Sequence, residues 1–593
     1  QGAGLRFLTG PITSPSLAEI MATILRDLPQ AKWHQYDPVA RDARVGGTPG
    51  GATAGAPIYH FDKADVVLTL DSDFLACGPG SVRYQKDFAA RRRVTTERRE
   101  MNRLYAIEST PSLTGTKADH RLVLKAGEIE GFARQLAAGL GAGRAGAAGS
   151  PAPSGTADTA RWVAAVAKDL QASRGTSVVV AGEYQPAAVH DLARAMNQAL
   201  GNVGTTVTYG GSIDAAPAAV GSLTELVAAM NAGQVEVLVM LGGNPVYSAP
   251  ADLKFQEALE KVNLRIYHGL YADETAFLCH WTVADTHPLE SWGDARAYDG
   301  TVTIIQPLIA PLYDGRSAHE VLGAFTSQSD RRTLAVVKEY WTRAFAGGSG
   351  WTIRTADGQA FKDVETFWRH ALHDGFIRGT GMADGGPATP FVAAPAAAAA
   401  SGAAAGAGVA SAPAPAPANT LANPNPPAPP AAPTAAPAAG AAAQAPAPPP
   451  APASPGGLEI IFRPDPTIWD GRFANNGWLQ ELPKPLTKVT WDTTAWISPQ
   501  LATERGLSDG DVIELKYRGN TAYLPVVRVP GHPAQSVTVF LGYGRRMAGG
   551  VGTATKEAQR FNAYLLRTSD APWFGSGLEI TRTGERYLLA TTQ

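Results

Sequence analysis

The chain has 593 residues, of which 45% are hydrophobic and 18% are charged, and its formal net charge is −2. This length predicts several domains, because one hydrophobic core rarely organises so many residues. The near-neutral charge excludes a broadly basic surface for nucleic acid or for an anionic membrane. The two cysteines are too few for a cysteine-ligated iron–sulfur cluster or a thiolate zinc site. No apolar run reaches the length of a membrane-spanning helix.

The first half of the sequence alternates apolar strand patterns with amphipathic helix patterns. In the first segment, strands are predicted at residues 5–10, 64–71 and 103–108, and helices at 16–28 and 81–93. In the second segment, strands are predicted at 176–182, 206–210, 235–245 and 264–270, and helices at 186–200 and 222–232. This alternation is typical of parallel sheets covered by helices on both faces. We therefore predict two Rossmann-like α/β lobes.

Composition sets the expected boundaries. A Gly/Ala/Ser/Pro stretch separates the two α/β segments, and an almost pure Ala/Pro tract has too little to bury to offset its chain entropy. The predicted division is an α/β lobe at 1–140, a linker at 141–158, a second α/β lobe with a helical extension at 159–386, an Ala/Pro-rich linker or insertion at 387–457, and a β domain at 458–593. The sequence begins with Gln1 and runs directly into a strand pattern, so we expect a mature or cropped piece of a longer polypeptide.

The last segment is rich in short β patterns separated by Gly, Pro, Asp and Asn turns. The patterns lie at 488–492, 511–519, 521–530, 536–544 and 584–592. Helical periodicity is scarce there. The segment is predicted to form a β-barrel or a related β domain.

Two loops that follow apolar strands are candidates for ligand contact. The sequence LGGNP, residues 241–245, would let a backbone approach a ligand at the carboxyl end of a parallel strand. Asp71 and Asp73 follow another strand, and a Gly-Pro-Gly turn then leads into a helix whose N-terminus could hold an anion. Spacing alone favours ordinary strand-to-loop turns in both places.

The sequence contains no set of residues with the spacing of a known catalytic or metal-binding motif. Cys279 and His280 are adjacent, but neighbouring residues rarely ligate one ion together, and HExxH, CxxC and GxSxG patterns are all missing. Cys77 has no His or second Cys near it in the sequence, which favours a buried thiol over a metal ligand or nucleophile. A disulfide between Cys77 and Cys279 is possible but is not predicted by the sequence. We predict no catalytic residue and no metal ligand.

Several segments resemble the molybdopterin oxidoreductases. These are residues 104–128, the Gly-Asn-Pro loop at 237–250, the stretch AYDGTVTIIQPLIAPLYDGRSAHEVL at 297–322, and residues 497–519 together with Asn562, which resemble the C-terminal dinucleotide-binding barrel of that family. Further motifs, among them LDSDFLACGPGSVRYQKDFAARRR, ESWGDARAYDGT and RTSDAPWFGSGLE, are similar to one branch, the large iron–sulfur subunit of bacterial alternative complex III. The resemblance covers nearly the whole chain except the Ala/Pro tract.

The resemblance implies a role in a quinol:electron-acceptor oxidoreductase. It implies a membrane-bound, multi-subunit complex with quinol-binding membrane subunits and haem c subunits, on the periplasmic face of the bacterial inner membrane. It also implies iron–sulfur clusters on a C-terminal domain outside this sequence, a preceding targeting segment, and loss of the molybdenum cofactor from this chain. The loop at residues 108–115 reads ESTPSLTG where active relatives commonly have an Asp-Pro-Arg type of loop. This departure weakens a dinucleotide site.

The sequence leaves three hypotheses open. The first is a structural, cofactor-free subunit; the second is a catalytically active molybdopterin oxidoreductase large subunit; the third is a binding module whose vestigial cleft holds another small ligand. No cofactor-binding residue is expected under the first hypothesis. The residues predicted to line a vestigial pocket are Asp71, Ser109, Thr110, Gly243, Asn244, Asp299 and Asn562.

Overall fold

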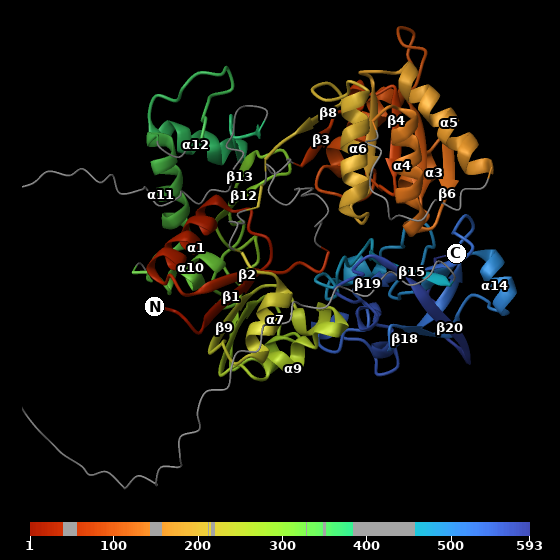
Figure 1. Ribbon diagram of the computed structural model, residues 1–593. Helices are drawn as coiled ribbons and strands as arrows, with labels where there is room; N and C mark the ends of the chain where they lie inside the picture. The colour runs from red at the N-terminus through yellow and green to blue at the C-terminus, as the bar shows by residue number, and fades with distance from the viewer. Residues whose placement is uncertain are drawn as a thin grey trace, which may run out of the picture. The chain divides into compact units, whose positions relative to one another are not determined.

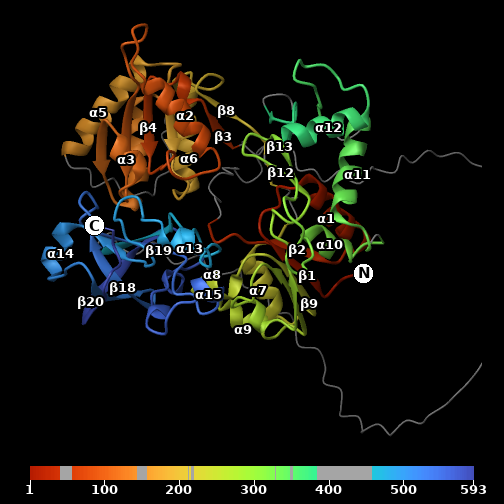
Figure 2. The same cartoon turned by 180° about the vertical axis from the view of Figure 1, so that it is seen from behind.

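A computed structural model describes residues 1–39, 56–142, 157–211, 213–214, 220–327, 329–347, 351–382 and 457–592. The predicted Ala/Pro-rich tract lies outside these residues, except for Gly457, and so does most of the predicted linker at 141–158. Figure 1 and Figure 2 show the arrangement of the elements from two sides. Most of the strands lie in three larger units, which are two parallel sheets and a closed barrel.

The first parallel sheet, with the helices that cover it, is called the β9 lobe. Its strand order is β11-β10-β9-β1-β2, and all four pairings are parallel. The strands are β1 Leu5–Thr9, β2 Lys32–Gln35, β9 Val237–Leu241, β10 Leu264–Gly269 and β11 Trp281–Ala284. Helices α1 (Pro15–Asp27) and α10 (Ala318–Gly323) pack on one face of the sheet, and α7 (Leu223–Asn231) and α9 (Phe255–Leu259) pack on the other.

The second parallel sheet and its helices are called the β4 lobe. The strand order is β6-β5-β4-β7, again parallel throughout. The strands are β4 Val66–Leu70, β5 Arg103–Glu108, β6 His120–Val123 and β7 Ser177–Ala181. Every residue of β4 and of β7 is buried, because α4 (Ile129–Gly139), α5 (Ala157–Ala172) and α6 (Ala187–Ala199) cover one face while α2 (Ser81–Arg92) covers the other.

The C-terminal segment closes into a six-stranded barrel. The order is β15-β19-β16-β18-β17-β20, with both parallel and antiparallel pairings. The strands are β15 Leu458–Pro464, β16 Ala495–Ile497, β17 Asp511–Tyr517, β18 Asn520–Arg528, β19 Ser536–Leu541 and β20 Phe574–Arg586. The largest apolar cluster of the described chain lies in the barrel, around fully buried side chains such as Phe462 and Ile513.

Smaller elements complete the described structure. A three-stranded antiparallel sheet joins β12 Gly293–Arg296, β13 Val302–Ile305 and β14 Phe376–Ile377, and β3 Pro57–Tyr59 pairs with β8 Val207–Tyr209. The remaining helices are α3 Leu113–Lys117, α8 Pro245–Ser248, α11 Thr333–Ala346, α12 Val364–Asp374, α13 Gly477–Glu481, α14 Pro499–Arg505 and α15 Gly549–Gly552.

Local sequence accounts for several helix starts. The Ser14 hydroxyl caps α1, and Pro15 occupies its first turn, where a missing N–H costs nothing. Ser222 and Glu225 form a reciprocal capping box at the start of α7. These caps fix where the chain leaves each strand-to-helix loop, and therefore fix the loops at the edges of the sheets.

The structure confirms the predicted fold class: parallel α/β sheets followed by a barrel. Sheet membership, however, does not follow the chain order of the two predicted α/β segments. Strands β1 and β2 from the first segment join β9, β10 and β11, while β7 from the second segment joins β4. Periodicity identifies a strand by burial on its faces, but it contains nothing about the strand's hydrogen-bonding partner.

Two of the predicted β patterns in the last segment were wrong in extent. Residues 488–492 form only an isolated bridge, from Val489 to Thr591. The predicted strand at 584–592 overlaps only the end of β20, which begins ten residues earlier at Phe574 and ends at Arg586. In the first segment, Lys488 and Trp491 have φ of +61° and +63°, which an extended strand does not adopt, so alternation of apolar residues was a poor guide to the ladder there.

Candidate functional site

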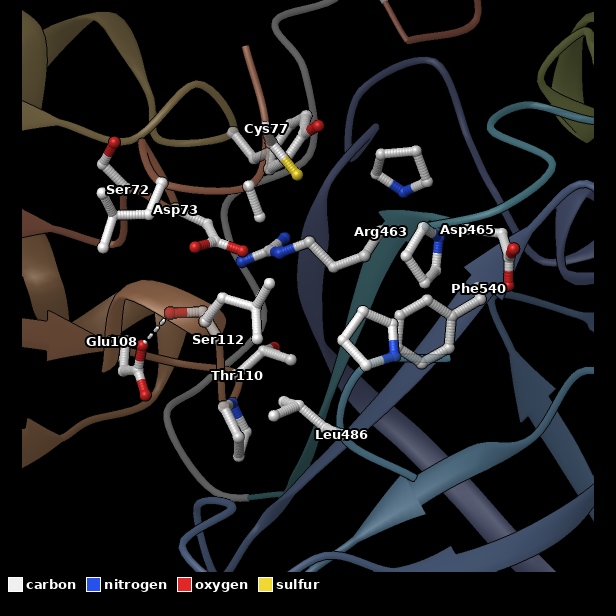
Figure 3. A pocket seen from close by; sticks show the side chains of 18 of the residues that line it. Ser72, Asp73, Cys77, Glu108, Thr110, Ser112, Arg463, Asp465, Leu486 and Phe540 are labelled. Atoms are coloured by element: carbon white, nitrogen blue, oxygen red, sulfur yellow. Dashed lines mark hydrogen bonds between the residues drawn. The ribbon is translucent and has the colours of Figure 1, made fainter. Parts of the chain in front are cut away.

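Two cavities lie at the carboxyl ends of the two parallel sheets, where α/β folds place their ligands. The first, called the β4 cavity, has a volume of about 450 Å³ and is lined by residues that follow β4 and β5 and by residues of the barrel. Figure 3 shows Asp73, Glu108 and Cys77 from the β4 lobe, with Arg463, Leu486 and Phe540 from the barrel, around this space.

A buried ion pair joins the barrel to the β4 lobe beside this cavity. Arg463, near the end of β15, places Nη2 2.7 Å from Oδ2 of Asp71, and the two side chains are only 11% and 4% exposed. Oδ1 of Asp71 also accepts hydrogen bonds from the backbone N–H and the hydroxyl of Ser109, at 2.8 and 2.9 Å. Gln185 Nε2 donates to Oδ2 at 2.8 Å. We call this cluster the β4 joint.

Two further carboxyl groups of the β4 cavity have pKa values shifted by burial. Burial raises the pKa of Asp73, although its Oδ1 accepts hydrogen bonds from the backbone N–H and the hydroxyl of Thr114. Burial also raises the pKa of Glu108, and the charge of Arg121 and the Ser112 hydroxyl act in the opposite direction. Raised carboxyl pKa values in a cleft are typical of functional sites, and here both groups face the same space.

The second cavity, called the β9 cavity, has a volume of about 410 Å³ and lies at the ends of β1, β9 and β10. Its lining includes Gly242, Gly243 and Asn244 from the LGGNP loop. Asp273 also lines it; burial raises the pKa of this carboxyl to about 6, while Tyr267 donates a hydrogen bond to it at 2.7 Å.

A second buried ion pair joins the barrel to the β9 lobe. Arg545, which follows β19, places Nη2 2.9 Å from Oε2 of Glu274, and the side chains are 6% and 4% exposed. Asn244 Nδ2 donates to the same oxygen at 2.7 Å, and the backbone N–H groups of Arg546 and Met547 donate to Oε1. Burial acts to raise the pKa of Glu274, but Arg545 outweighs it, so this pKa lies below its usual value. We call this cluster the β9 joint.

The donor set of the two cavities does not fit a pterin dinucleotide. The pyrophosphate of such a cofactor requires cationic groups or aligned backbone N–H groups that are available to it. Among the described residues, five carboxyl groups and two cationic groups line the β4 cavity. Each Arg or Lys that lines either cavity is already paired with a carboxylate: Arg463 with Asp71, Lys484 with Asp465, Arg472 with Asp470 and Asp37, and Arg545 with Glu274. An added pyrophosphate would meet net negative charge.

The described residues do not form a metal site either. Within the described ranges, no group of three or more His, Cys, Asp or Glu side chains is placed to hold a metal ion. Cys77 and Cys279 are not joined by a disulfide, and burial raises the pKa of the Cys279 thiol to about 12, which makes it a poor nucleophile.

The structure brings together most of the residues predicted to line a vestigial pocket. Asp71, Ser109 and Thr110 lie together at the β4 joint, where Thr110 also contacts the barrel through a 2.9 Å hydroxyl–hydroxyl hydrogen bond to Thr538. Gly243 and Asn244 lie together at the β9 cavity.

Two predicted residues lie elsewhere. Asp299 accepts a hydrogen bond from Thr301 N–H in a turn, and the Asn562 side chain caps a short 3-10 helix in the barrel segment. Neither is among the residues that line the two cavities.

Sequence reasoning missed the barrel residues that complete both clusters. Arg463 and Arg545 lie outside the β patterns predicted from the sequence, 392 and 271 positions away from their carboxylate partners. Glu108 was predicted as the last residue of the strand at 103–108 and the first of the loop at 108–115, but it was not selected as a pocket residue. Its position at the carboxyl end of β5, one strand away from Asp71, was the available signal.

Comparisons with known proteins agree with this architecture. No protein-family model matches the sequence. NADPH-Fe(3+) oxidoreductase subunit alpha of Geobacter sulfurreducens, in two strains, is 31% identical over 107 residues, which are 18% of this chain and only 13% of that protein. The structure of acetylene hydratase from Pelobacter acetylenicus is similar at a TM-score of 0.60 and 11% identity, over 97% of this chain and 86% of that chain.

The near-complete coverage by acetylene hydratase defines the class of fold. With parallel α/β sheets and a six-stranded C-terminal barrel, the chain has the fold of the molybdopterin enzymes. At 11% identity, this likeness shows the fold alone. Over the described part of the chain, none of the helices combines the length and the apolar character needed to cross a membrane.

Proposed function

We propose that this chain is a cofactor-free, non-catalytic relative of the molybdopterin oxidoreductases that serves as a structural part of a membrane-bound quinol:electron-acceptor oxidoreductase. The observation that supports this proposal best is the pair of barrel arginines at the carboxyl edges of the two sheets. Each lines a cavity at the carboxyl edge of a sheet, and each is neutralised by a buried carboxylate of this chain.

The two ion pairs give the chain an internal substitute for a bound cofactor. A cofactor between the lobes and the barrel would hold them together through its own contacts. Here Arg463 and Arg545 make those contacts directly, and their hydrogen-bonded carboxylates leave little unsatisfied charge. A fold stabilised in this way can keep its architecture without the cofactor's chemistry.

The membership of a complex rests on the sequence resemblance to the large iron–sulfur subunit of alternative complex III. Under this proposal, iron–sulfur clusters are held by a domain outside this sequence, and haem c and membrane subunits complete the electron path. Quinol would be oxidised in a membrane subunit at the periplasmic face. The α/β lobes and the barrel would act as the platform on which the cluster domain docks.

A second candidate function is a catalytically active molybdopterin oxidoreductase large subunit. It is favoured by the two cavities of about 450 and 410 Å³ that remain at the carboxyl edges, where the fold would hold its cofactor. The carboxylate-rich lining argues against it.

The test is the molybdenum, tungsten and iron content of the purified native complex, measured together with a pterin assay on the denatured protein. We expect iron without molybdenum, tungsten or pterin. Stoichiometric molybdenum or tungsten with pterin would overturn the proposal and establish the second candidate.

A further inference from the structure

More carboxyl groups than cationic groups line the β4 cavity, and the β4 joint pairs only one of these carboxyl groups with an arginine. The five lining carboxyl groups are those of Asp71, Asp73, Glu108, Glu183 and Asp465. Asp71 is paired with Arg463 and Asp465 with Lys484. Glu108 is paired with Arg121, which approaches it from outside the cavity lining. Asp73 has no cationic partner among the residues that the structure describes; it accepts hydrogen bonds from Thr114.

The barrel segment supplies apolar and aromatic side chains to the same cavity. Leu486, Trp469, Trp496 and Phe540 line the cavity from this segment. The Trp496 and Phe540 side chains are almost fully buried, and their rings are 4.7 Å apart in an edge-to-face contact. Figure 3 shows the carboxylates of Asp73 and Glu108 on one side of the space, and Leu486 and Phe540 on the other.

The volume and the lining together define a small-molecule site. A cavity of about 450 Å³ is of the size that small ligands occupy, and an apolar wall with a few polar groups is their usual surrounding. A carboxylate binds an amidinium or guanidinium through paired, charge-assisted hydrogen bonds, and aromatic rings attract a desolvated cation. An anionic ligand would face uncompensated carboxylate charge in the same place.

We propose that the β4 cavity binds a small organic monocation, an amidinium or guanidinium group on an apolar body, with the cation at Asp73 and the apolar part against Trp496 and Phe540. This ligand class is opposite in charge to a nucleotide cofactor. The site goes beyond the proposed structural role and does not depend on it.

The first experiment compares three probes of the same shape on the purified native complex. Benzamidine is cationic, benzamide is neutral and benzoate is anionic, while all three carry the same ring. Calorimetric titration should give a dissociation constant for benzamidine at least about tenfold below that for benzamide, with no binding of benzoate. Equal affinities for the three probes, or no benzamidine binding up to about 10 mM, would overturn the inference.

A charge-removing variant locates the bound cation. Asp73→Asn keeps an oxygen acceptor for Thr114 but removes the negative charge, and it should weaken benzamidine binding about tenfold. The matched control is Asp62→Asn, an exposed aspartate of the same lobe outside the cavity, which should bind benzamidine like the wild type. Unchanged benzamidine affinity in a folded Asp73→Asn protein contradicts the proposed site.

A native cysteine gives a second readout that needs no variant. Cys77 lines the β4 cavity, whereas Cys279 is not among its lining residues. Saturating benzamidine should slow alkylation of Cys77 by iodoacetamide several-fold in peptide mass spectrometry, while the slow alkylation of Cys279 stays the same. Alkylation of Cys77 at an unchanged rate would show that the probe binds elsewhere. A complex free of molybdenum and pterin that also fails these tests retains the proposed function and loses only this inference.

Discussion

The β4 and β9 lobes end their central strands in the same backbone turn but place different side chains there. Leu70 of β4 is followed by Asp71 at φ +63°, and Leu241 of β9 is followed by Gly242 at φ +66°. Each residue donates its backbone N–H to the neighbouring strand, Asp71 to Ile107 O at 2.7 Å and Gly242 to His268 O at 2.8 Å. The two turns share this backbone conformation, although the two loops have unrelated sequences.

The difference between the two turns decides where the carboxylate of each joint comes from. In the β4 lobe, the residue in the turn is itself the acid that binds the barrel arginine. In the β9 lobe, the turn holds a glycine, and Glu274 from the loop after β10 takes that role. An aspartate at positive φ is strained by roughly 1–2 kcal/mol, so the β4 lobe accepts a backbone cost to place its carboxylate.

The two joints also differ in how many hydrogen bonds the arginine gives to its carboxylate. Arg545 donates to Glu274 from both Nε and Nη2. Arg463 donates to Asp71 from Nη2 alone, and Ser109 and Gln185 supply the other donors. The comparison therefore predicts that the β9 joint depends more strongly on its arginine.

The largest effect is expected for Arg545→Met. This change leaves Glu274 as a buried carboxylate without its cation, which should lower the free energy of unfolding by about 3–5 kcal/mol. Urea denaturation followed by circular dichroism measures it. The control is Arg528→Met, which removes an exposed pair with Asp509 and should cost less than about 1 kcal/mol. Equal losses in the two variants would show that the β9 joint contributes no more than a surface contact.

A smaller loss is expected for Arg463→Met. Arg463 gives Asp71 a single hydrogen bond, and Asp71 keeps those from Ser109 and Gln185, so the free energy of unfolding should fall by about 2 kcal/mol. The same urea titration applies, with Asp71→Asn in the Arg463→Met background as the second variant. Since Asn has no charge to leave unpaired, the double variant should recover part of the loss. A loss larger than that of Arg545→Met would reverse the ranking of the two joints.

The turn in the β9 lobe can be tested by Gly242→Ala. A Cβ at this position would meet nothing within 4 Å, so the cost comes from the positive φ alone and should be about 1 kcal/mol. Gly10 lines the same cavity, and a Cβ there would also meet open space, but its φ is not in the left-handed region. Gly10→Ala should therefore leave the thermal midpoint unchanged, and equal shifts for the two variants would contradict the assignment of strain.

The smallest effect, judged at pH 6, is the pH dependence that His532 contributes on the β4 side of the barrel. His532 contacts Thr538, the partner of Thr110, and burial lowers the pKa of His532 to about 4. Because the unfolded pKa is about 6.5, the unfolded chain binds more protons between these values, and stability present above pH 6.5 is lost as the pH falls towards 4.

At pH 6 this loss should be below about 1 kcal/mol. His532→Asn should flatten the dependence of the unfolding free energy on pH between 6.5 and 4, as measured by urea titrations at several pH values. Parallel curves for the wild type and the variant would show that another group titrates there.

The sequence indicated the carboxyl edges of both parallel sheets, but not the barrel residues that lie against them. Buried runs such as that of β4 predicted parallel strands, and polar residues directly after them marked Asp71 and Asn244 as pocket candidates. Loops after parallel strands gather at one edge, so these residues could be found without coordinates. Asp299 and Asn562 were selected by resemblance of motifs, and neither lies in the lining of the two cavities.

What the sequence determines by itself is therefore local: buried strands, capped helices, turns that favour glycine, and a barrel segment separated from the α/β part by an Ala/Pro tract. What only the tertiary structure decides is which strands share a sheet and which distant charges meet. Strands β1 and β2 lie with β9 because of backbone pairing that periodicity does not encode. Arg463 reaches Asp71 across 392 positions of sequence because the barrel covers the edge of the sheet. Because both charges are buried, removal of either partner leaves the other charge unpaired, and this dependence exists only in the folded chain.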